Sequence, residues 1–149
     1  MPIVKELTDC RVLIVDDAKA NVDMLVEALR GDYKLSVALD GEAALRAIER
    51  NAPDLLLLDE PMEGLAPVIV ERLFAVFELL RDAGKFGIIL VEQYVNLALS
   101  FAPSTVVLDR GRVIYDGRSA DLAADPERMA AYFGASGRDS QRAGETVEA

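Results

Sequence analysis

The sequence predicts an α/β protein built on a doubly wound parallel sheet with strand order 2-1-3-4-5. Short apolar segments alternate with segments of helical periodicity through most of the 149 residues. The apolar segments are also continuous rather than alternating, which is typical of parallel strands covered on both faces. Right-handed crossovers between such strands give a doubly wound sheet, and its ligand site lies beyond the carboxyl ends of the strands.

Three strands and two helices are expected in the first 59 residues. The strands are apolar segments that end at charged or turn-forming residues: 11–15, 34–39 and 55–58. After the first strand, apolar residues recur at helical spacing, at Val22, Leu25, Val26 and Leu29. Gly31 ends that helix, and a second helix over 42–50 is broken by Pro53.

The second half repeats this rhythm and adds a hairpin. Helices are expected over 68–83 and 94–101, and strands over 86–91 and 105–108. Asp109-Arg110-Gly111 is a tight turn into a strand over 112–115, which predicts an added C-terminal β-hairpin. A last helical region begins at Ser119 and reaches about Phe133. The expected organisation is one α/β domain over 1–133 and a flexible tail over 134–149.

Composition excludes several kinds of chemistry. The chain has 26 acidic and 16 basic residues, a formal net charge of −10, one cysteine and no histidine. Histidine-dependent catalysis, a histidine metal site, an internal disulfide and a zinc thiolate cluster are therefore excluded. The acidic balance predicts that neither nucleic acid nor a membrane is a partner. No leader segment or membrane span is visible, so we expect a cytoplasmic location.

Acidic residues fall at the carboxyl ends of the expected strands. Asp16 and Asp17 end the first strand and Asp59 ends the third, which is its neighbour in the predicted order. Like charges raise one another's pKa, and Mg²⁺ would relieve that repulsion, so these three aspartates are the predicted metal ligands. Taken singly, each aspartate is better explained as a strand-end or helix-capping residue, and only the meeting of three at one edge favours a metal site. Residues expected near the same edge, as a second layer around the metal, are Glu60, Glu92, Gln93 and Asp109.

A segment-by-segment match covers residues 1–59. Its parts are Arg11-Val-Leu-Ile-Val-Asp-Asp17, Asn21, Ala38-Leu-Asp-Gly-Glu-Ala-Ala-Leu45 and Pro53-Asp-Leu-Leu-Leu-Leu-Asp59. This stretch resembles the receiver domain of two-component response regulators. The resemblance implies a flavodoxin-like fold, Mg²⁺ at Asp16 and Asp17, phosphorylation of Asp59, and a sensor kinase as partner. Beyond Asp59 the receiver pattern stops, because the Ser or Thr and the Lys that act on the phosphoryl group are missing.

A second match covers residues 55–133. Its parts are Leu55-Leu-Leu-Leu-Asp-Glu-Pro61, Gly64-Leu-Ala-Pro67, Ile89-Leu-Val-Glu-Gln93 and Val107-Leu-Asp-Arg-Gly-Arg-Val-Ile-Tyr-Asp-Gly117. This stretch resembles the nucleotide-binding domain of ABC transporters, of the branched-chain amino acid and urea importer type. The resemblance implies that Asp59 binds metal at the end of a Walker B strand and that Glu60 is the catalytic glutamate.

The motifs that would complete an ATPase are missing from the sequence. There is no Gly-x-x-x-x-Gly-Lys-Ser/Thr loop to hold phosphates and no Leu-Ser-Gly-Gly-Gln signature. Glu60 can then act as a general base only if a nucleotide is placed beside it, and we expect no catalysis by this chain.

These observations together predict a receiver/ABC hybrid, recombined or deliberately built, with an acidic Mg²⁺-binding edge and no catalytic activity. The two resemblances overlap at the strand 55–59. Two alternatives stay open, a phosphoacceptor receiver domain acting through Asp59 and an ATP-binding fragment of an ABC importer. The chain is expected to be a monomer, or a homodimer joined through the edge of the hairpin.

Overall fold

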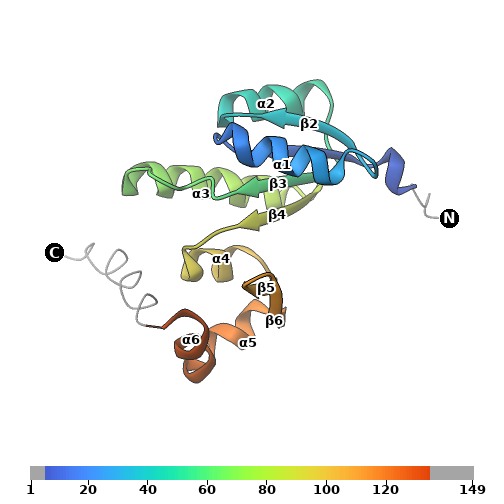
Figure 1. The fold of residues 1–149 in the computed structure, drawn as a ribbon. Coiled ribbons are helices and arrows are strands. Elements are labelled where there is room, and N and C mark those ends of the chain that lie inside the picture. The colour runs from blue at the N-terminus through green and yellow to red at the C-terminus, as the bar shows by residue number, and fades with distance from the viewer. Residues whose placement is uncertain (1–5, 135–149) are drawn as a thin grey trace. The chain divides into compact units, whose positions relative to one another are not determined.

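The computed structural model describes residues 6–134. The chain divides into two compact units, and the boundary in the sequence falls between Val91 and Glu92 (Figure 1). This differs from the single domain expected over 1–133. The physical reason lies in the last strands, which pair with each other and leave the parallel sheet without a fifth member. The expected tail lies outside the described residues, except for Gly134, which caps the last helix.

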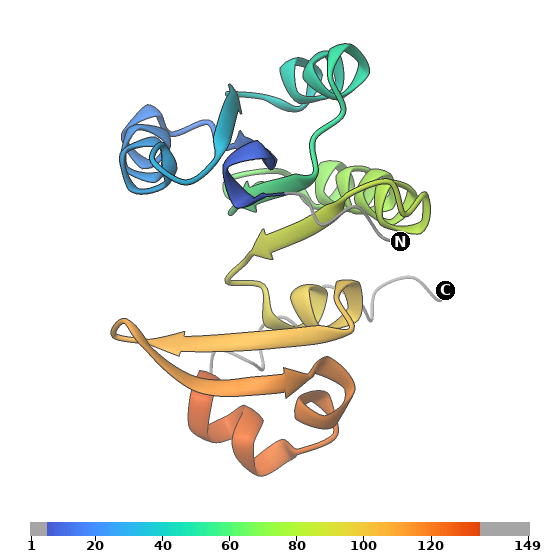
Figure 2. The same ribbon diagram turned by 90° about the vertical axis from the view of Figure 1, so that its right-hand side faces the viewer.

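The first unit is a four-stranded parallel sheet with the order β2-β1-β3-β4. Its strands are β1 (Arg11–Val15), β2 (Lys34–Ala38), β3 (Leu55–Asp59) and β4 (Gly87–Val91). Its helices are η1 (Leu7–Asp9), α1 (Lys19–Leu29), α2 (Gly41–Arg50) and α3 (Pro67–Asp82). Figure 2 shows α1 on one side of this sheet and α2 and α3 on the other. The order of the first four strands is the predicted one, but the five-stranded flavodoxin-like sheet is not formed, because β5 does not join it.

The core of this unit is built on its two central strands. In β1 the residues from Val12 to Val15 are all buried, because α1 covers one face of the strand and α2 and α3 lie over the other. In β3 burial alternates, with Leu56 and Leu58 each 2% exposed. These two leucines point toward α2 and α3, since they line a pocket together with residues of both helices.

Asp54 fixes the register at the start of β3. Its carboxylate accepts a hydrogen bond of 2.7 Å from the backbone N–H of Arg11. Its backbone N–H donates to the carbonyl of Arg11 at 2.8 Å, and its carbonyl accepts from Gly87 at 2.9 Å. One residue therefore aligns β3 with both of its neighbours, β1 and β4.

The second unit is an antiparallel hairpin with three short helices. Its elements are α4 (Val95–Phe101), β5 (Ser104–Asp109), β6 (Arg112–Arg118), α5 (Ser119–Ala123) and α6 (Pro126–Phe133). Arg110 and Gly111 form the turn, both with positive φ, as the two-residue hairpin turn requires. The predicted hairpin is thus confirmed, and its second strand is longer than expected. The last helical region is split in two, because Asp125 caps α6 and Pro126 begins it.

Among the described residues, none of the helices combines the length and the apolar character that crossing a bilayer requires.

Leu56→Ala should lower the free energy of unfolding of the first unit by about 2–5 kcal/mol, because it leaves a cavity between β3 and the helices. Leu79→Ala is the matched control, since Leu79 is 71% exposed on α3 and its loss should change stability by no more than about 0.5 kcal/mol. Urea denaturation measures both. Equal effects of the two substitutions would contradict this description of the core.

Candidate functional site

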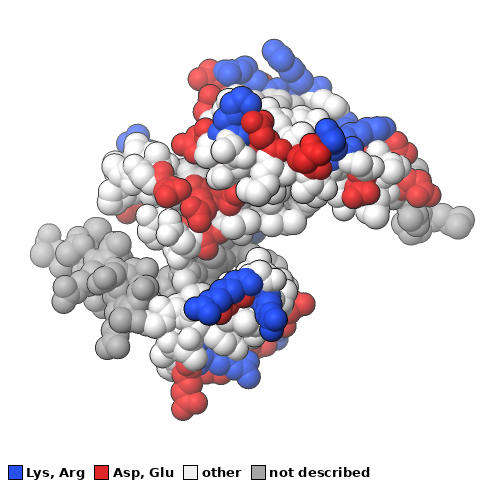
Figure 3. All heavy atoms as spheres, in the orientation of Figure 1, with Lys and Arg blue, Asp and Glu red and all other residues white. Residues whose placement is uncertain are grey.

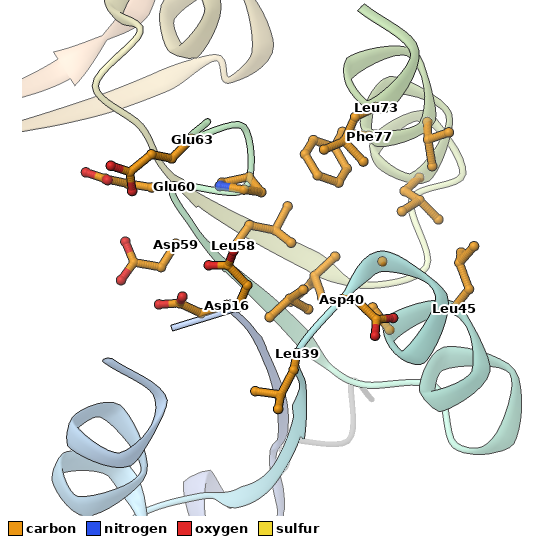
Figure 4. Close-up of a pocket in the computed structure, with 18 of the residues that line it drawn as sticks. Asp16, Leu39, Asp40, Leu45, Leu58, Asp59, Glu60, Glu63, Leu73 and Phe77 are labelled. Atoms are coloured by element: carbon orange, nitrogen blue, oxygen red, sulfur yellow. The ribbon is translucent and has the colours of Figure 1, made fainter. Parts of the chain in front are cut away.

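A pocket of about 360 Å³ opens at the carboxyl end of the parallel sheet, between α2 and α3. Leu56 and Leu58 of β3 form part of its wall. Figure 4 shows two distinct ends. The carboxyl groups of Asp16, Asp59, Glu60 and Glu63 gather at one end, and Leu45, Leu73 and Phe77 lie at the other.

Asp16 and Asp59 form the centre of the acidic end. Asp16 follows β1 directly and is 5% exposed, and Asp59 is the last residue of β3 and is half-buried. One oxygen of Asp16, Oδ1, accepts a hydrogen bond of 2.8 Å from the backbone N–H of Ala18. The other oxygen, Oδ2, is buried and has no hydrogen-bond partner in the described part of the chain. Such an oxygen is costly to keep away from water.

Burial raises the pKa of Asp59 above its ordinary value of 3.8. Repulsion from the charge of Asp16 raises this pKa further, and so does a hydrogen bond that the protonated Asp59 makes to Asp16. A cation between the two carboxylates would relieve the repulsion between them. The pair is electrostatically suited to a positively charged ligand.

Two further predicted residues, Asp17 and Glu60, line the same pocket. Asp17 is exposed, and the described residues contain no cluster of three or more Asp, Glu, Cys or His side chains that could hold a metal ion. The structure thus brings Asp16 and Asp59 together but does not add Asp17 to a three-carboxylate cage. Glu60 has a positive φ of 43°, and its N–H donates to the carbonyl of Val91 at 2.9 Å. This contact holds the residue after Asp59 against the end of β4.

The remaining predicted residues, Glu92, Gln93 and Asp109, belong to the second unit. Glu92 accepts a hydrogen bond of 3.4 Å from the N–H of Tyr94. Gln93 is exposed, and Asp109 is exposed at the end of β5. Their placement around Asp59 stays a prediction.

Sequence reasoning missed the apolar part of the pocket and two of its acidic residues. Leu45, Leu73 and Phe77 have the spacing of core residues, and nothing in the sequence says that the two helices leave space between them. Glu63 falls in a turn without periodicity. Asp40 had a usable signal, since it also follows a strand, and it lies near Leu45 apart from the other carboxyls (Figure 4).

The pocket differs in charge from the rest of the first unit. No Lys or Arg is among its described lining residues. Six acidic residues line it: Asp16, Asp17, Asp40, Asp59, Glu60 and Glu63. On the face shown in Figure 3, acidic and basic side chains of this unit are mixed. Several surface carboxylates have a basic partner, in the pairs Lys19–Asp23, Arg30–Glu27, Lys34–Asp9 and Arg46–Glu42. The pocket is therefore a local concentration of negative charge.

The chain is similar in sequence to ATP-binding proteins of transporters. It is 36% identical over 127 residues to the high-affinity branched-chain amino acid transport ATP-binding protein BraG of Pseudomonas aeruginosa. The aligned region covers 80% of this chain and 54% of BraG. It is 36% identical over 100 residues to the energy-coupling factor transporter ATP-binding protein EcfA2 of Streptococcus sanguinis, which covers 67% of this chain and 36% of that protein. The chain thus spans about half or less of the length of these relatives.

Solved structures agree at the level of the fold. The structure of CbiO1 from Clostridium perfringens, part of an ABC transporter complex, has a TM-score of 0.50 and 20% identity over 66% of this chain and 41% of that one. No protein-family model matches the chain. The C-terminal part of the chain therefore resembles the ATP-binding domains of ABC transporters, and the fold is mixed α/β with a parallel sheet. None of these comparisons supports a receiver domain or a chimera.

One expectation about partners is wrong. The acidic composition predicted that the chain has no membrane partner, but its relatives are ATP-binding proteins of transporters. Net charge reports on nonspecific attraction to anionic surfaces and is silent on a specific protein contact at a membrane.

Asp59→Asn should stabilise the first unit at neutral pH. Folding raises the pKa of the Asp59 carboxyl, so the protonated form stabilises the folded state. This stabilisation is complete below the pKa of the unfolded chain, and it is lost as the pH rises through the pKa of the folded state. The asparagine cannot ionise, so its advantage over the parent should be present at about pH 7 and fade toward about pH 3. Denaturation at both pH values measures it, with the exposed Asp32→Asn as control. A parent protein more stable than Asp59→Asn at neutral pH would contradict the electrostatic account.

Proposed function

We propose that this chain acts as a part of an ABC-type ATP-binding domain and binds Mg²⁺ at Asp59 and Asp16. Three observations support the proposal. The C-terminal part resembles such domains. Asp59 ends, and Glu60 follows, a strand that resembles their metal-binding strand. A buried aspartate oxygen beside Asp59 lacks a partner in the described chain. The last of these carries the most weight, because it concerns atoms of this protein.

The residues present fit a magnesium ion. Mg²⁺ is usually bound through one or two carboxylates, with waters and substrate phosphates completing its octahedral shell. Two converging carboxylates are therefore enough, and a third from Asp17 is not needed. A divalent charge would also remove the repulsion that raises the pKa of Asp59. When bound, the ion would supply neutralisation of phosphate charge.

Glu60 would serve as a general base only toward a nucleotide held by other residues. Its backbone is anchored to the end of β4, next to Asp59. The sequence has no phosphate-binding loop, and no basic side chain lines the described pocket. Six carboxylates repel a triphosphate, so we propose that this chain alone neither binds nor hydrolyses ATP, and that an ATP site would need a phosphate-binding loop from elsewhere.

Mg²⁺ should raise the midpoint of thermal unfolding of the parent. At a concentration about tenfold above the dissociation constant, binding adds about 1.4 kcal/mol, or about 5–10 °C for a unit of this size. ATP added together with Mg²⁺ should give no further increase. Asp16→Asn should abolish the response, and Asp32→Asn should retain it. An unchanged midpoint in the parent would sink the magnesium proposal, and a further rise with ATP would sink the proposal that the chain does not bind nucleotide.

A second candidate function is phosphorylation of Asp59, as in a receiver domain. One observation favours it: the order β2-β1-β3-β4 places the end of β3 directly beside the end of β1, as the receiver resemblance implies. Asp59 is half-buried and therefore accessible to a small phosphodonor.

Acetyl phosphate with Mg²⁺ should, on this second candidate, add the mass of one phosphoryl group to the parent and none to Asp59→Asn. Intact-mass spectrometry is the measurement. Labelling should be partial and short-lived, because the Ser or Thr and the Lys that stabilise the phosphoryl group in receivers are missing from the matching positions. Labelling of both proteins to the same extent would rule out Asp59 as the acceptor.

A further inference from the structure

We propose that the pocket of the first unit binds a small organic cation, an ammonium or guanidinium group carried on an apolar body. This goes beyond the proposed function, although the positively charged group would lie against Asp16 and Asp59, the same two residues.

The acidic end selects the charge of the ligand. All six charged residues in the described lining are acidic, so an anion is disfavoured throughout the pocket. A second and independent observation is the side chain of Asp16, which lines the pocket, is 95% buried and has an oxygen without a partner in the described chain. A charged N–H donor in the pocket would be attracted to these carboxylates, and it makes a stronger hydrogen bond to a carboxylate than a neutral donor does.

The apolar end selects the body of the ligand. Leucine, isoleucine, valine and phenylalanine side chains of α2 and α3 face the space: Leu45, Ile48, Leu73, Val76, Phe77 and Leu80. Two of them are exposed, Leu45 at 46% and Val76 at 38%. A ligand body placed between the two helices would remove this apolar surface from water, which favours binding. A bare metal ion gains nothing from these apolar side chains.

The arrangement of the two ends requires both properties in one molecule. Figure 4 shows the carboxyls of Asp16 and Asp59 on one side and Leu73 and Phe77 on the other. The space of about 360 Å³ between them lies in the range of small-molecule sites. A neutral apolar ligand leaves the carboxylates of the acidic end without a counter-charge. An inorganic cation leaves the apolar side chains in contact with water, so a cation with an apolar chain suits the whole pocket.

The test compares three probes of graded chemistry on the full chain: n-hexylammonium, n-hexanol and methylammonium. Methyl NMR of the leucine and valine side chains reports the site, and the titration gives each dissociation constant. Hexylammonium should bind with shifts at Leu45 and Leu73, and the other two probes should bind at least about tenfold more weakly. Equal binding of hexylammonium and hexanol would overturn the proposal, because the charge would then play no part. Absence of shifts at the pocket leucines would overturn it as well.

Two variants locate the two ends. Asp16→Asn should weaken hexylammonium binding about tenfold and leave hexanol unchanged, and Asp32→Asn, outside the pocket, should leave both unchanged. Ala44→Leu should weaken all apolar probes, since Ala44 lies in the pocket wall and a larger side chain there fills the space. Mg²⁺ titrated into the same samples keeps the proposals apart. Hexylammonium binding without a Mg²⁺ response contradicts only the proposed metal site, and the reverse result contradicts only the organic-cation site.

Discussion

The parallel pairing of β1 with β3 is the constraint on which the rest of the first unit depends. Val15 lies opposite Leu58 in this ladder, so the next residue of each strand, Asp16 and Asp59, is brought to the same edge. Asp54 sets the alignment at the other end of the strands, through a side-chain and a backbone hydrogen bond to Arg11. A shift of one residue in the register of β3 would turn Leu56 and Leu58 away from α2 and α3. The burial of these leucines therefore fixes the register that brings the two carboxyls together.

Much of the first unit could be predicted from sequence because its signals are local. Continuous apolar strands, helical spacing and right-handed crossovers are enough for the order of four strands and for the approach of Asp16 to Asp59. The behaviour of β5 could not be predicted in the same way. A strand at that position can join the parallel sheet or pair with its successor, and the turn at Arg110 and Gly111 favours the successor because it closes a short loop. The empty space between α2 and α3 has no sequence signal, because a residue facing a pocket and a residue facing a partner helix have the same periodicity.

The strand β3 carries both family resemblances, and the structure shows why such a strand is compatible with either. Its apolar residues pair with β1 on one side and β4 on the other, and only its last residue, Asp59, is a candidate for chemistry. An apolar central strand that ends in an aspartate suits a parallel sheet in general and does not by itself indicate one function. The relatives support the ABC resemblance of the C-terminal part, and that support rests on more of the chain than this strand, since the match to BraG extends over 127 residues.

The positive φ of Glu60 has a consequence for how this protein could change. A residue with a Cβ held in the left-handed region costs about 1 kcal/mol or more relative to glycine, which adopts it freely. Position 60 is therefore one where the demands of the backbone and of the carboxylate oppose each other. Glycine would give the more stable sheet edge, and glutamate keeps an acidic group beside Asp59 at the expense of stability. Selection for stability alone would replace Glu60 with glycine. A more stable variant that still carries glutamate at this position would therefore have kept it for its chemistry.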